Sequence, residues 1–321
     1  MAEDIFAFDT LDETLKRTKD LLWPVRWGVW LRLAVIAFFV GGGFSSPNFN
    51  YSTPAPQGMP GISPDMLPLV VGAVALIIVL ALVFGFISAT VQFVFVDCLT
   101  TGEFTLARFF RERLGKGARL FLFQAALVLL LILILAAVFL AGFGGAAFGV
   151  PNFLAIIGAI LLLLPVILVF ALILGLTIDF VVPIMIRDDC GVLAGWRRLW
   201  PAMASQAWQT VAYVVVRVIL NIVAAIILFI LLLIALVIIA IPFVLAALAL
   251  YSTGIPEPDW IAANLPAIIA LTALFLIIYI PVSLLIQVPF VAFFRHYSLL
   301  VLGRLAPAYD LVRPPSPPAA E

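Results

Sequence analysis

The sequence predicts an all-α integral membrane protein with about six transmembrane helices in three repeats, each an interfacial amphipathic helix followed by a helical hairpin. The first observation is composition: 65% of the 321 residues are hydrophobic and 11% are charged. Soluble domains, by comparison, carry about 25% charged residues. The second is that apolar runs of about 18 or more residues, long enough to cross a bilayer, recur along the chain. The third is that basic residues gather in alternate connections.

The apolar runs define six predicted spans. Residues 208 to 251 would measure about 66 Å as one helix, against a hydrocarbon core of about 30 Å. We therefore expect a break at Pro242, after which Phe243 to Leu250 either lies on the outer surface or re-enters the membrane. Prolines inside other spans predict kinks. The spans cover residues 27–43, 67–96, 120–141, 153–186, 208–241 and 261–294, and those prolines are Pro165, Pro183, Pro281 and Pro289.

The connections between these spans are of two kinds. Residues 44–65, 142–151 and 251–259 contain no Lys or Arg, whereas residues 99–119 and 187–206 are basic. Because basic connections remain in the cytoplasm, both termini are predicted to be cytoplasmic in a multi-pass protein of the cell membrane. The N-terminal stretch lacks a basic region of a cleavable signal, so the first span is expected to remain as an anchor. The glycosylation sequon at Asn50 would then face outside, and its use stays open.

An internal repeat organises the chain as a single membrane domain. The predicted units are residues 1–98, 99–187 and 188–298, followed by a disordered Pro-rich tail over about 312–321. Each unit begins with a short amphipathic segment, and the tripeptide Leu-Trp-Pro occurs in two of them, at residues 22–24 and 199–201. Thr10 and Glu13 have the spacing of a capping box. The apolar faces are Phe8, Leu11, Leu15 and Leu22; Phe104, Leu106, Phe110 and Leu114; and Val192, Trp196 and Leu199.

The stretch DFVVPIMIRDDCGVLAGWRRLWP, residues 179–201, concentrates charged residues within an apolar chain. We interpret it as a membrane exit in which Asp189 caps the next helix and Gly191 permits a tight turn. A catalytic loop is the alternative, but adjacent aspartates on a helix point apart. In the first interpretation, tryptophans rest at headgroup depth and arginines face lipid phosphates. The predicted headgroup contacts are Arg108, Arg111, Trp196, Arg197, Arg198 and Trp200.

A resemblance follows from this stretch. Phe180-Val-Val-Pro183, the charged turn after it, and the helix with Ala194 and Trp196 resemble a broad group of multi-pass proteins. That group includes the membrane domain attached to some glycerophosphodiester phosphodiesterases. The stretch LLWPVRWGVWLRLAVIAFFVGGGFSSP is similar to an uncharacterised archaeal membrane family. The resemblance implies the fold and transfers no catalytic residue, since no hydrophilic segment here is long enough to hold the phosphodiesterase domain.

Polar residues inside the predicted spans are functional candidates because each ionisable group costs about 3 kcal/mol at mid-depth. Asp179 and Arg217 lie at similar predicted depths on consecutive spans, so we predict that they pair. Asn221, Gln92 and Gln287 extend a candidate polar network. One interpretation is a structural pair that joins spans, and the other is a proton or anion site in a cavity.

These features bear on three possible functions. The favoured one is a non-enzymatic lipid-interacting or scaffolding membrane module, and the alternative is a transporter or channel centred on Asp179 and Arg217. An enzyme is disfavoured because the chain has a single His296, two separated cysteines (Cys98 and Cys190) and no Gly-x-Ser-x-Gly motif. We expect no catalytic residue, cofactor or metal. Membrane lipids are the expected partners, nucleic acid is not, and a homo-oligomer or a membrane-protein partner stays open.

Overall fold

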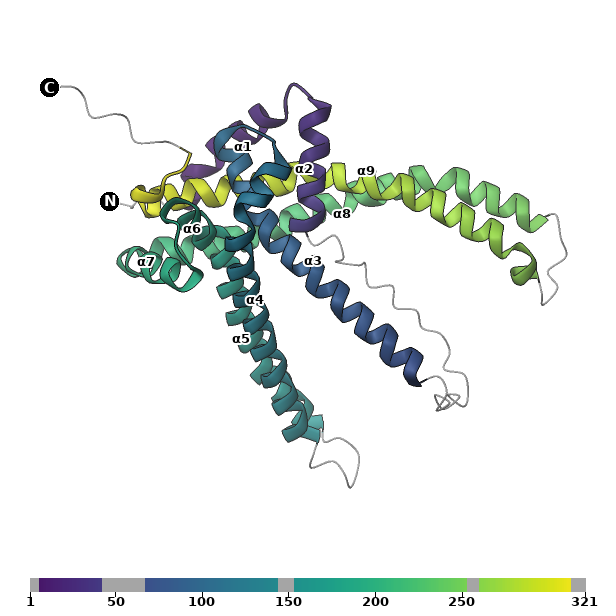
Figure 1. The fold of residues 1–321 in the computed structure, drawn as a ribbon, viewed down its shortest axis with the longest axis horizontal. Coiled ribbons are helices and arrows are strands. Elements are labelled where there is room, and N and C mark those ends of the chain that lie inside the picture. The colour runs from purple at the N-terminus through teal and green to yellow at the C-terminus, as the bar shows by residue number, and fades with distance from the viewer. Residues whose placement is uncertain (1–5, 42–66, 144–152, 253–259, 313–321) are drawn as a thin grey trace. The chain divides into compact units, whose positions relative to one another are not determined.

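The computed structural model describes residues 6–41, 67–143, 153–252 and 260–312, which form helices and, within those ranges, no strand (Figure 1). The sequon at Asn50 and the tail from residue 313 lie outside the described residues, as do most residues of the three connections that lack Lys and Arg. The helices are α1 (Phe6–Leu22), α2 (Trp27–Val40), α3 (Leu67–Thr101), α4 (Leu106–Phe143), α5 (Phe153–Leu176), the π-helix η3 (Thr177–Val181), α6 (Val182–Asp188), α7 (Val192–Ser205), α8 (Ala207–Ser252), α9 (Trp260–Leu305) and the 3-10 turn η4 (Pro307–Tyr309).

Among the residues that the structure describes, five helical stretches are long and apolar enough to cross a membrane. They run over Leu67–Thr101, Leu106–Val138, Leu161–Asp188, Ala207–Tyr251 and Asn264–Leu305. The predicted first span, residues 27–43, is not one of these stretches. The helix found there, α2, has 14 residues, which is about 21 Å of helix against a core of about 30 Å. The all-helical class is therefore confirmed, with five helices that could span a membrane, while a sixth span and the threefold repeat stay predictions.

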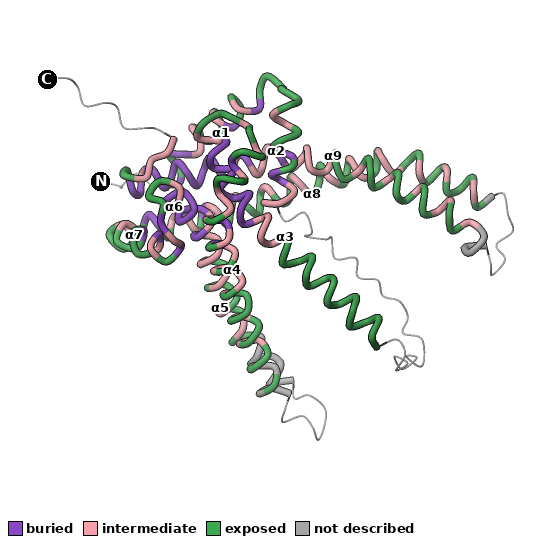
Figure 2. The backbone as a smooth tube through the Cα atoms, in the orientation of Figure 1, coloured by how far each residue is buried: buried purple, intermediate pink, exposed green. Residues whose placement is uncertain are grey.

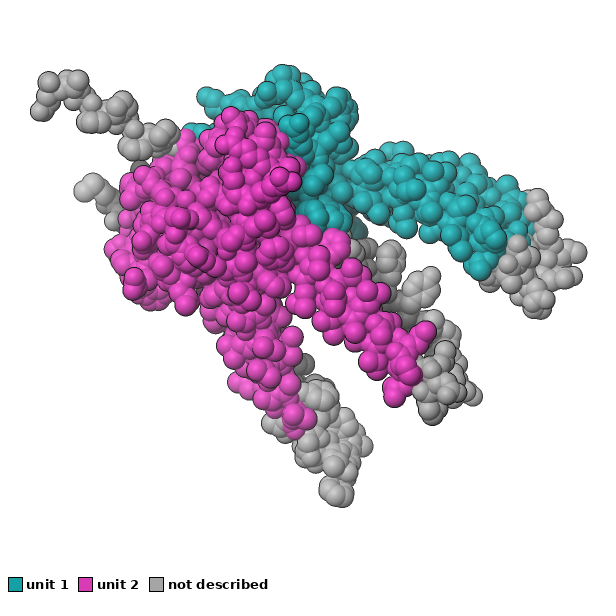
Figure 3. Space-filling view, viewed as in Figure 1, with its two compact units in different colours: residues 1–43, 208–297 teal, residues 44–207, 298–321 magenta. Residues whose placement is uncertain are grey.

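The chain divides into two compact units, which are described separately (Figure 3). Unit 1 contains Met1–Gly43 and Trp208–Tyr297, and unit 2 contains Phe44–Ala207 and Ser298–Glu321. In both, the long helices are packed at one end and expose apolar side chains at the other (Figure 2). In α3, for example, the residues from Leu67 to Val83 are exposed, whereas Ala89 to Cys98 are all buried. Such a division suits a helix that leaves a protein core and continues into lipid.

Unit 1 holds α1 against α8 and α9 through a row of small residues. The buried face of α1 is Ala7, Thr10, Thr14, Thr18 and Leu22, whereas Phe8 and Leu15 of the predicted apolar face are exposed. Thr10 donates its hydroxyl to the Phe6 carbonyl at 2.9 Å and Thr14 donates to the Thr10 carbonyl at 2.6 Å. A threonine that bonds to its own helix in this way packs like a small apolar residue.

Hydrogen bonds to α8 and α9 secure α1 in unit 1. The Tyr297 hydroxyl of α9 donates to the Ala7 carbonyl at 3.2 Å, and the Phe6 N–H donates to Gln209 Oε1 of α8 at 3.1 Å. The helix begins at Phe6, so the capping box predicted at Thr10 and Glu13 is also wrong. Glu13 instead pairs with Arg17, one turn later, at 3.0 Å.

The predicted break at Pro242 does not occur. Helix α8 continues through this proline to Ser252, so Phe243 to Leu250 is neither a separate surface helix nor a re-entrant one. Its partner is α9, where the Phe275 ring lies edge-on to Phe243 with centroids 5.4 Å apart. Contacts along the neighbouring helix hold this turn in place despite the hydrogen bond that proline removes.

In unit 2, α3 and α4 form an antiparallel hairpin. Gly102 has a φ of +71°, the left-handed conformation that glycine adopts readily, in the connection between them. Farther along the helices, the rings of Phe86 and Phe121 lie edge-to-face at 6.0 Å. Helix α4 runs without interruption from Leu106 to Phe143. The segment predicted as a second, separate interfacial helix is therefore the first part of α4 itself.

The turn between α6 and α7 also differs from its prediction. Asp189 ends α6 in the left-handed conformation with φ 49°, and Gly191 is extended with φ −85° and ψ 169°. Gly191 precedes α7 with no side-chain cap, so Asp189 caps no following helix and Gly191 supplies no left-handed turn. Helix α7 buries Val192, Gly195 and Leu199. A Cβ on Gly195 would lie 2.7 Å from a methyl carbon of Val181, so the two segments approach closely there.

Candidate functional site

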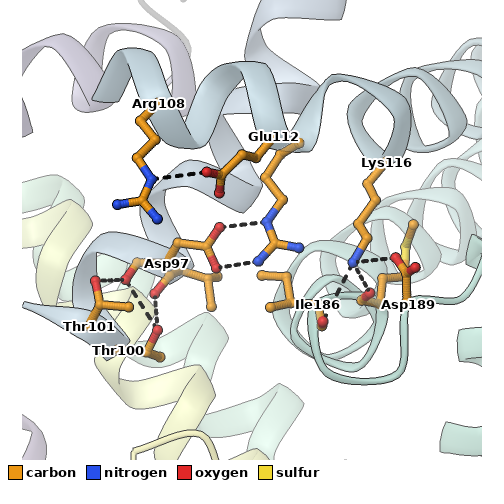
Figure 4. Close-up of polar contacts among 11 residues, drawn as sticks. Asp97, Thr100, Thr101, Arg108, Glu112, Lys116, Ile186 and Asp189 are labelled. Carbon is orange, nitrogen blue, oxygen red and sulfur yellow. Dashed lines mark hydrogen bonds and ion pairs between the residues drawn. The ribbon is translucent and has the colours of Figure 1, made fainter. Parts of the chain in front are cut away.

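The strongest polar feature is a cluster in unit 2 where the packed ends of α3, α4 and α6 meet, which we call the polar junction (Figure 4). Its centre is an ion pair between Asp97 of α3 and Arg113 of α4. Arg113 Nε donates to Asp97 Oδ2 at 2.7 Å and Nη2 donates to Oδ1 at 3.1 Å. Asp97 is 4% exposed, so the carboxylate is satisfied by a two-point contact in a largely dry setting.

Threonines complete the α3 side of the junction. Thr101 donates its hydroxyl to the Asp97 carbonyl at 2.7 Å, and Thr100 donates to the Val96 carbonyl at 3.0 Å. Both hydroxyls bond back to a carbonyl four residues earlier in α3. The Glu103 N–H in turn donates to the Thr101 hydroxyl at 3.2 Å, which fixes the start of the connection.

Lys116 joins α4 to the end of α6. Its Nζ donates to the Met185 carbonyl at 2.9 Å and lies 2.8 Å from Asp189 Oδ1. A cation at the last carbonyls of a helix complements the negative end of its dipole. Asp189 is well exposed, and the hydrogen bond and charge of Lys116 lower the pKa of its carboxyl, assisted by Arg119 and Arg113. The aspartate predicted to be a cap therefore acts as an ion-pair partner.

Asp188 ties the C-terminal segment to the turn before α7. Arg198 of α7 donates to Asp188 Oδ2, and the Tyr309 hydroxyl donates to the same oxygen at 3.0 Å. Arg187 adds a bond from Nη1 to the Asp310 carbonyl at 3.2 Å. Burial, followed by the bond to Asp188, raises the pKa of Tyr309. We call these residues the C-terminal clasp.

A π-helix lies in the last predicted span of unit 2, at Thr177–Val181. The Val182 N–H donates to the Thr177 carbonyl, five residues back, immediately before Pro183. Short π-helical turns are frequent at functional sites. Asp179 is within this turn and is 3% exposed. Hydropathy alone gave no signal for a π-helix, although the pairing of an apolar run with Pro183 indicated a kink.

The predicted headgroup residues have different surroundings. Trp196 Nε1 donates to the Thr177 hydroxyl at 3.0 Å, so this indole is turned into unit 2. Arg108 pairs with Glu112 one turn along α4 at 3.0 Å, and Arg198 belongs to the C-terminal clasp. Arg111, Arg197 and Trp200 are exposed.

The predicted polar network is distributed over both units. Gln92 and Asp179 are buried in unit 2, and the remaining three residues belong to unit 1. Arg217 donates to the Tyr213 hydroxyl at 2.6 Å, and its guanidinium carbon is 5.8 Å from the ring centroids of Tyr213 and Phe294. Asn221 Nδ2 donates to the Arg217 carbonyl at 2.9 Å and Gln287 Nε2 donates to the Ser283 carbonyl at 3.2 Å. The pairing of Asp179 with Arg217 stays a prediction.

Exposed tryptophans mark the packed ends of the helices. The exposed fractions are 68% for Trp23, 66% for Trp27, 64% for Trp200 and 67% for Trp208. In both Leu-Trp-Pro tripeptides the leucine is buried and the tryptophan is exposed. Their backbones differ, because the first lies at the end of α1 and the second lies inside α7. The two tripeptides therefore share a buried leucine next to an exposed tryptophan, and they do not share a backbone turn.

The hydrogen bonds and ion pairs at the packed ends of the helices were not predicted from the sequence. The Asp97–Arg113 pair was missed, although an acidic residue in an apolar run followed by a basic segment was a usable signal. His296 Nδ1 lies 3.3 Å from the Thr18 hydroxyl in unit 1, a contact that no sequence pattern indicated. Within the described residues, no group of three or more His, Cys, Asp and Glu side chains has the arrangement of a metal site.

Comparison with known proteins places the chain in a family. A Family of unknown function (DUF7544) matches residues 5–312. No curated protein and no solved structure matches the chain. The predicted membership of an uncharacterised family is confirmed at that level, whereas the archaeal and phosphodiesterase resemblances stay predictions. The match covers nearly the whole chain, which therefore belongs to the DUF7544 family.

Proposed function

We propose that this protein is a non-enzymatic integral membrane module whose packed ends bind the headgroups of anionic lipids at the cytoplasmic face. Both termini lie in the cytoplasm in this proposal. The observation that carries it is the burial pattern: the most apolar windows of four of the five candidate spans are 0% buried. Side chains of this kind are stable only in lipid or in a further protein contact, and five such helices favour lipid.

The chemistry at the packed ends supports headgroup binding. Tryptophans favour the membrane interface, because one side of the ring is apolar and the N–H can bond to headgroups or water. Arg111 and Arg197 are also exposed, and a guanidinium matches the two oxygens of a phosphate. Arg108 already bonds to Glu112 through Nε, which leaves other N–H groups of its five for a phosphate. Juxtamembrane basic residues contribute about 1 kcal/mol each toward an anionic surface.

Spin-labelled lipids in vesicles containing the full chain test this proposal. Wild type should restrict phosphatidylglycerol more than phosphatidylcholine, and the preference should fall with salt because exposed charges are screened. Replacing Arg108, Arg111 and Arg197 by Gln should reduce the preference by about a hundredfold, because three contacts of about 1 kcal/mol each are lost. The matched control replaces the same three residues by Lys and should retain most of it. Equal restriction of both lipids by wild type would contradict the proposal.

Transport of a small solute or ion is the second candidate. The π-helix around buried Asp179 favours it, because discontinuous helices in a membrane often surround binding sites. Cysteines placed singly at positions 179, 217, 221 and 287, in a background with Cys98→Ser and Cys190→Ser, would report water at those depths. Labelling by a membrane-impermeant thiol reagent from one side would favour transport over lipid binding as the function. Absence of labelling at all four positions would leave lipid binding as the function.

A further inference from the structure

The basic residues of α4 lie on two sides of the helix. On the inner side, Arg113 and Lys116 form the ion pairs of the polar junction (Figure 4). On the outer side, Arg111 and Arg119 are exposed, and neither makes a hydrogen bond or an ion pair among the described residues. The inner two therefore hold unit 2 together, whereas the outer two can bind a ligand.

A glycine lies between the two outer arginines. Arg111, Gly115 and Arg119 follow one another at steps of four residues, which keeps them on one side of the helix. A Cβ on Gly115 would meet nothing within 4 Å, so the space between the two arginines is open. Along the helix axis the arginines are about 12 Å apart. We call these three residues the arginine row.

The charge around the row favours an anion. Glu112 is the only acidic residue of α4, and Arg108 bonds to its carboxylate at 3.0 Å. Because this ion pair carries no net charge, the outer side of α4 keeps the two positive charges of the arginine row.

Position along α4 decides which part of a lipid each arginine reaches. Leu120 to Phe143 contains no charged residue, and this stretch is about 36 Å of helix, enough to cross a hydrocarbon core of about 30 Å. Leu122, on the same side as the row, is 65% exposed. Arg119 therefore lies at the level of the lipid phosphates in the proposed membrane orientation. Arg111 lies up to about 12 Å farther into the cytoplasm.

We propose that the arginine row binds a lipid headgroup that carries a second phosphate. Arg119 binds the phosphodiester and Arg111 binds the outer phosphate, each through paired N–H donors of the guanidinium. The open space at Gly115 holds the part of the headgroup that joins the two phosphates. A headgroup with a single phosphate engages one of the two arginines. This inference rests on the proposed binding of anionic headgroups and names the lipid class that one site prefers.

Spin-labelled phosphatidylinositol 4-phosphate in vesicles containing the full chain tests the preference. Wild type should restrict this lipid about fivefold more than spin-labelled phosphatidylglycerol, because a second arginine is engaged. Arg111→Gln should remove this preference. Arg26→Gln is the matched control, since it removes an exposed positive charge of unit 1 and should keep the preference.

A variant that changes no charge separates a site from general attraction between charges. Gly115→Leu fills the space between the arginines and should lose most of the fivefold preference. Ala107→Leu adds the same side chain at an exposed position of α4 outside that space and should keep it. A preference that survives Gly115→Leu would reflect lipid charge alone and would overturn the inference.

The outcomes distinguish this inference from the proposed function. Equal restriction of the two anionic lipids by wild type, with both restricted more than phosphatidylcholine, would overturn the inference and leave anionic-lipid binding in place. Equal restriction of all three lipids would overturn both.

A measurement on wild type alone guards against variants that fail to fold. Phosphatidylinositol 4-phosphate with a photoactivatable diazirine in its headgroup should label residues 106–122 about fivefold more than residues 192–205, which include the exposed Arg197. Equal labelling of the two segments would overturn the inference. Free inositol 1,4-bisphosphate, at the concentration of the lipid, should leave the labelling unchanged. Full displacement by it would assign the row to a soluble phosphate and overturn the lipid assignment.

Discussion

Arg113 holds both carboxylate oxygens of Asp97, at 2.7 Å and 3.1 Å, and in doing so joins α4 to the buried end of α3. The side chains are 22% and 6% exposed respectively. Removing one partner of such a pair leaves a charge without compensation in a poorly solvated place. The contribution of the pair to the stability of the α3–α4 hairpin is therefore seen most clearly when only one of the two residues is replaced.

The first prediction concerns this pair. Arg113→Ala should destabilise the folded chain by about 3 kcal/mol because it leaves the buried carboxylate alone. Arg108→Ala is the matched control, since it removes an exposed pair on the same helix and should cost below about 1 kcal/mol. The midpoint of thermal unfolding of the detergent-solubilised chain measures both. Similar shifts for the two variants would show that the Asp97 pair is not central to the junction.

Two glycines of α4 should respond to alanine in opposite directions. A Cβ on Gly117 would lie 2.1 Å from Thr90 Oγ1 and 2.9 Å from Thr90 Cα, whereas a Cβ on Gly115 meets nothing within 4 Å. Gly117→Ala must separate α3 from α4 and should cost about 2 kcal/mol. Gly115→Ala should stabilise the helix by about 1 kcal/mol, the usual gain in helix propensity. Equal melting temperatures for the two variants would contradict the close packing at Thr90.

The third prediction is a pH dependence at Asp189. Lys116 lowers the pKa of this carboxyl in the folded chain. Its contribution to stability is therefore present above the unfolded pKa of about 4 and is lost as pH falls through the folded pKa. Asp189→Asn removes the charge and keeps a residue that tolerates φ 49°. The difference in melting temperature between wild type and this variant should be present at neutral pH and disappear in acid. A difference that persists after Asp189 is protonated would assign the effect to something other than the ion pair.

The C-terminal clasp gives the fourth prediction. Tyr309→Phe removes the hydroxyl that donates to Asp188 and should cost about 1 kcal/mol, the net value of one hydrogen bond. The loss should appear locally, as faster hydrogen exchange in residues 306–312, because the clasp holds this segment. Arg187→Gln should increase the same exchange through the Asp310 carbonyl. Unchanged exchange in both variants would mean that the segment is held by packing at Gly303 instead.

Apolar runs predicted the long helices because transfer into lipid dominates their placement and depends on composition alone. The packed face of α1 was not predictable from hydropathy, because Thr10 and Thr14 satisfy their hydroxyls on their own helix and then pack as small residues. The continuation of α8 through Pro242 depends on contacts with α9 beside it. The Asp97–Arg113 pair depends on a helix reversal between its members, which charge spacing does not encode. Of the candidate network, the buried positions of Asp179 and Gln92 agree with intramembrane polar residues that avoid lipid.

Accessibility of single spin labels in vesicles tests directly whether the distal surfaces of the long helices face lipid. Labels would replace the exposed residues Ile77, Leu133, Leu164, Ile227 and Ile277, with buried Phe93 as the control. If these surfaces face lipid, we expect oxygen, which concentrates in the bilayer, to relax the five distal labels strongly. A water-soluble nickel complex should not relax them. The label at position 93 should be shielded from both. Strong relaxation of the distal labels by the nickel complex would place them in water and contradict the membrane assignment.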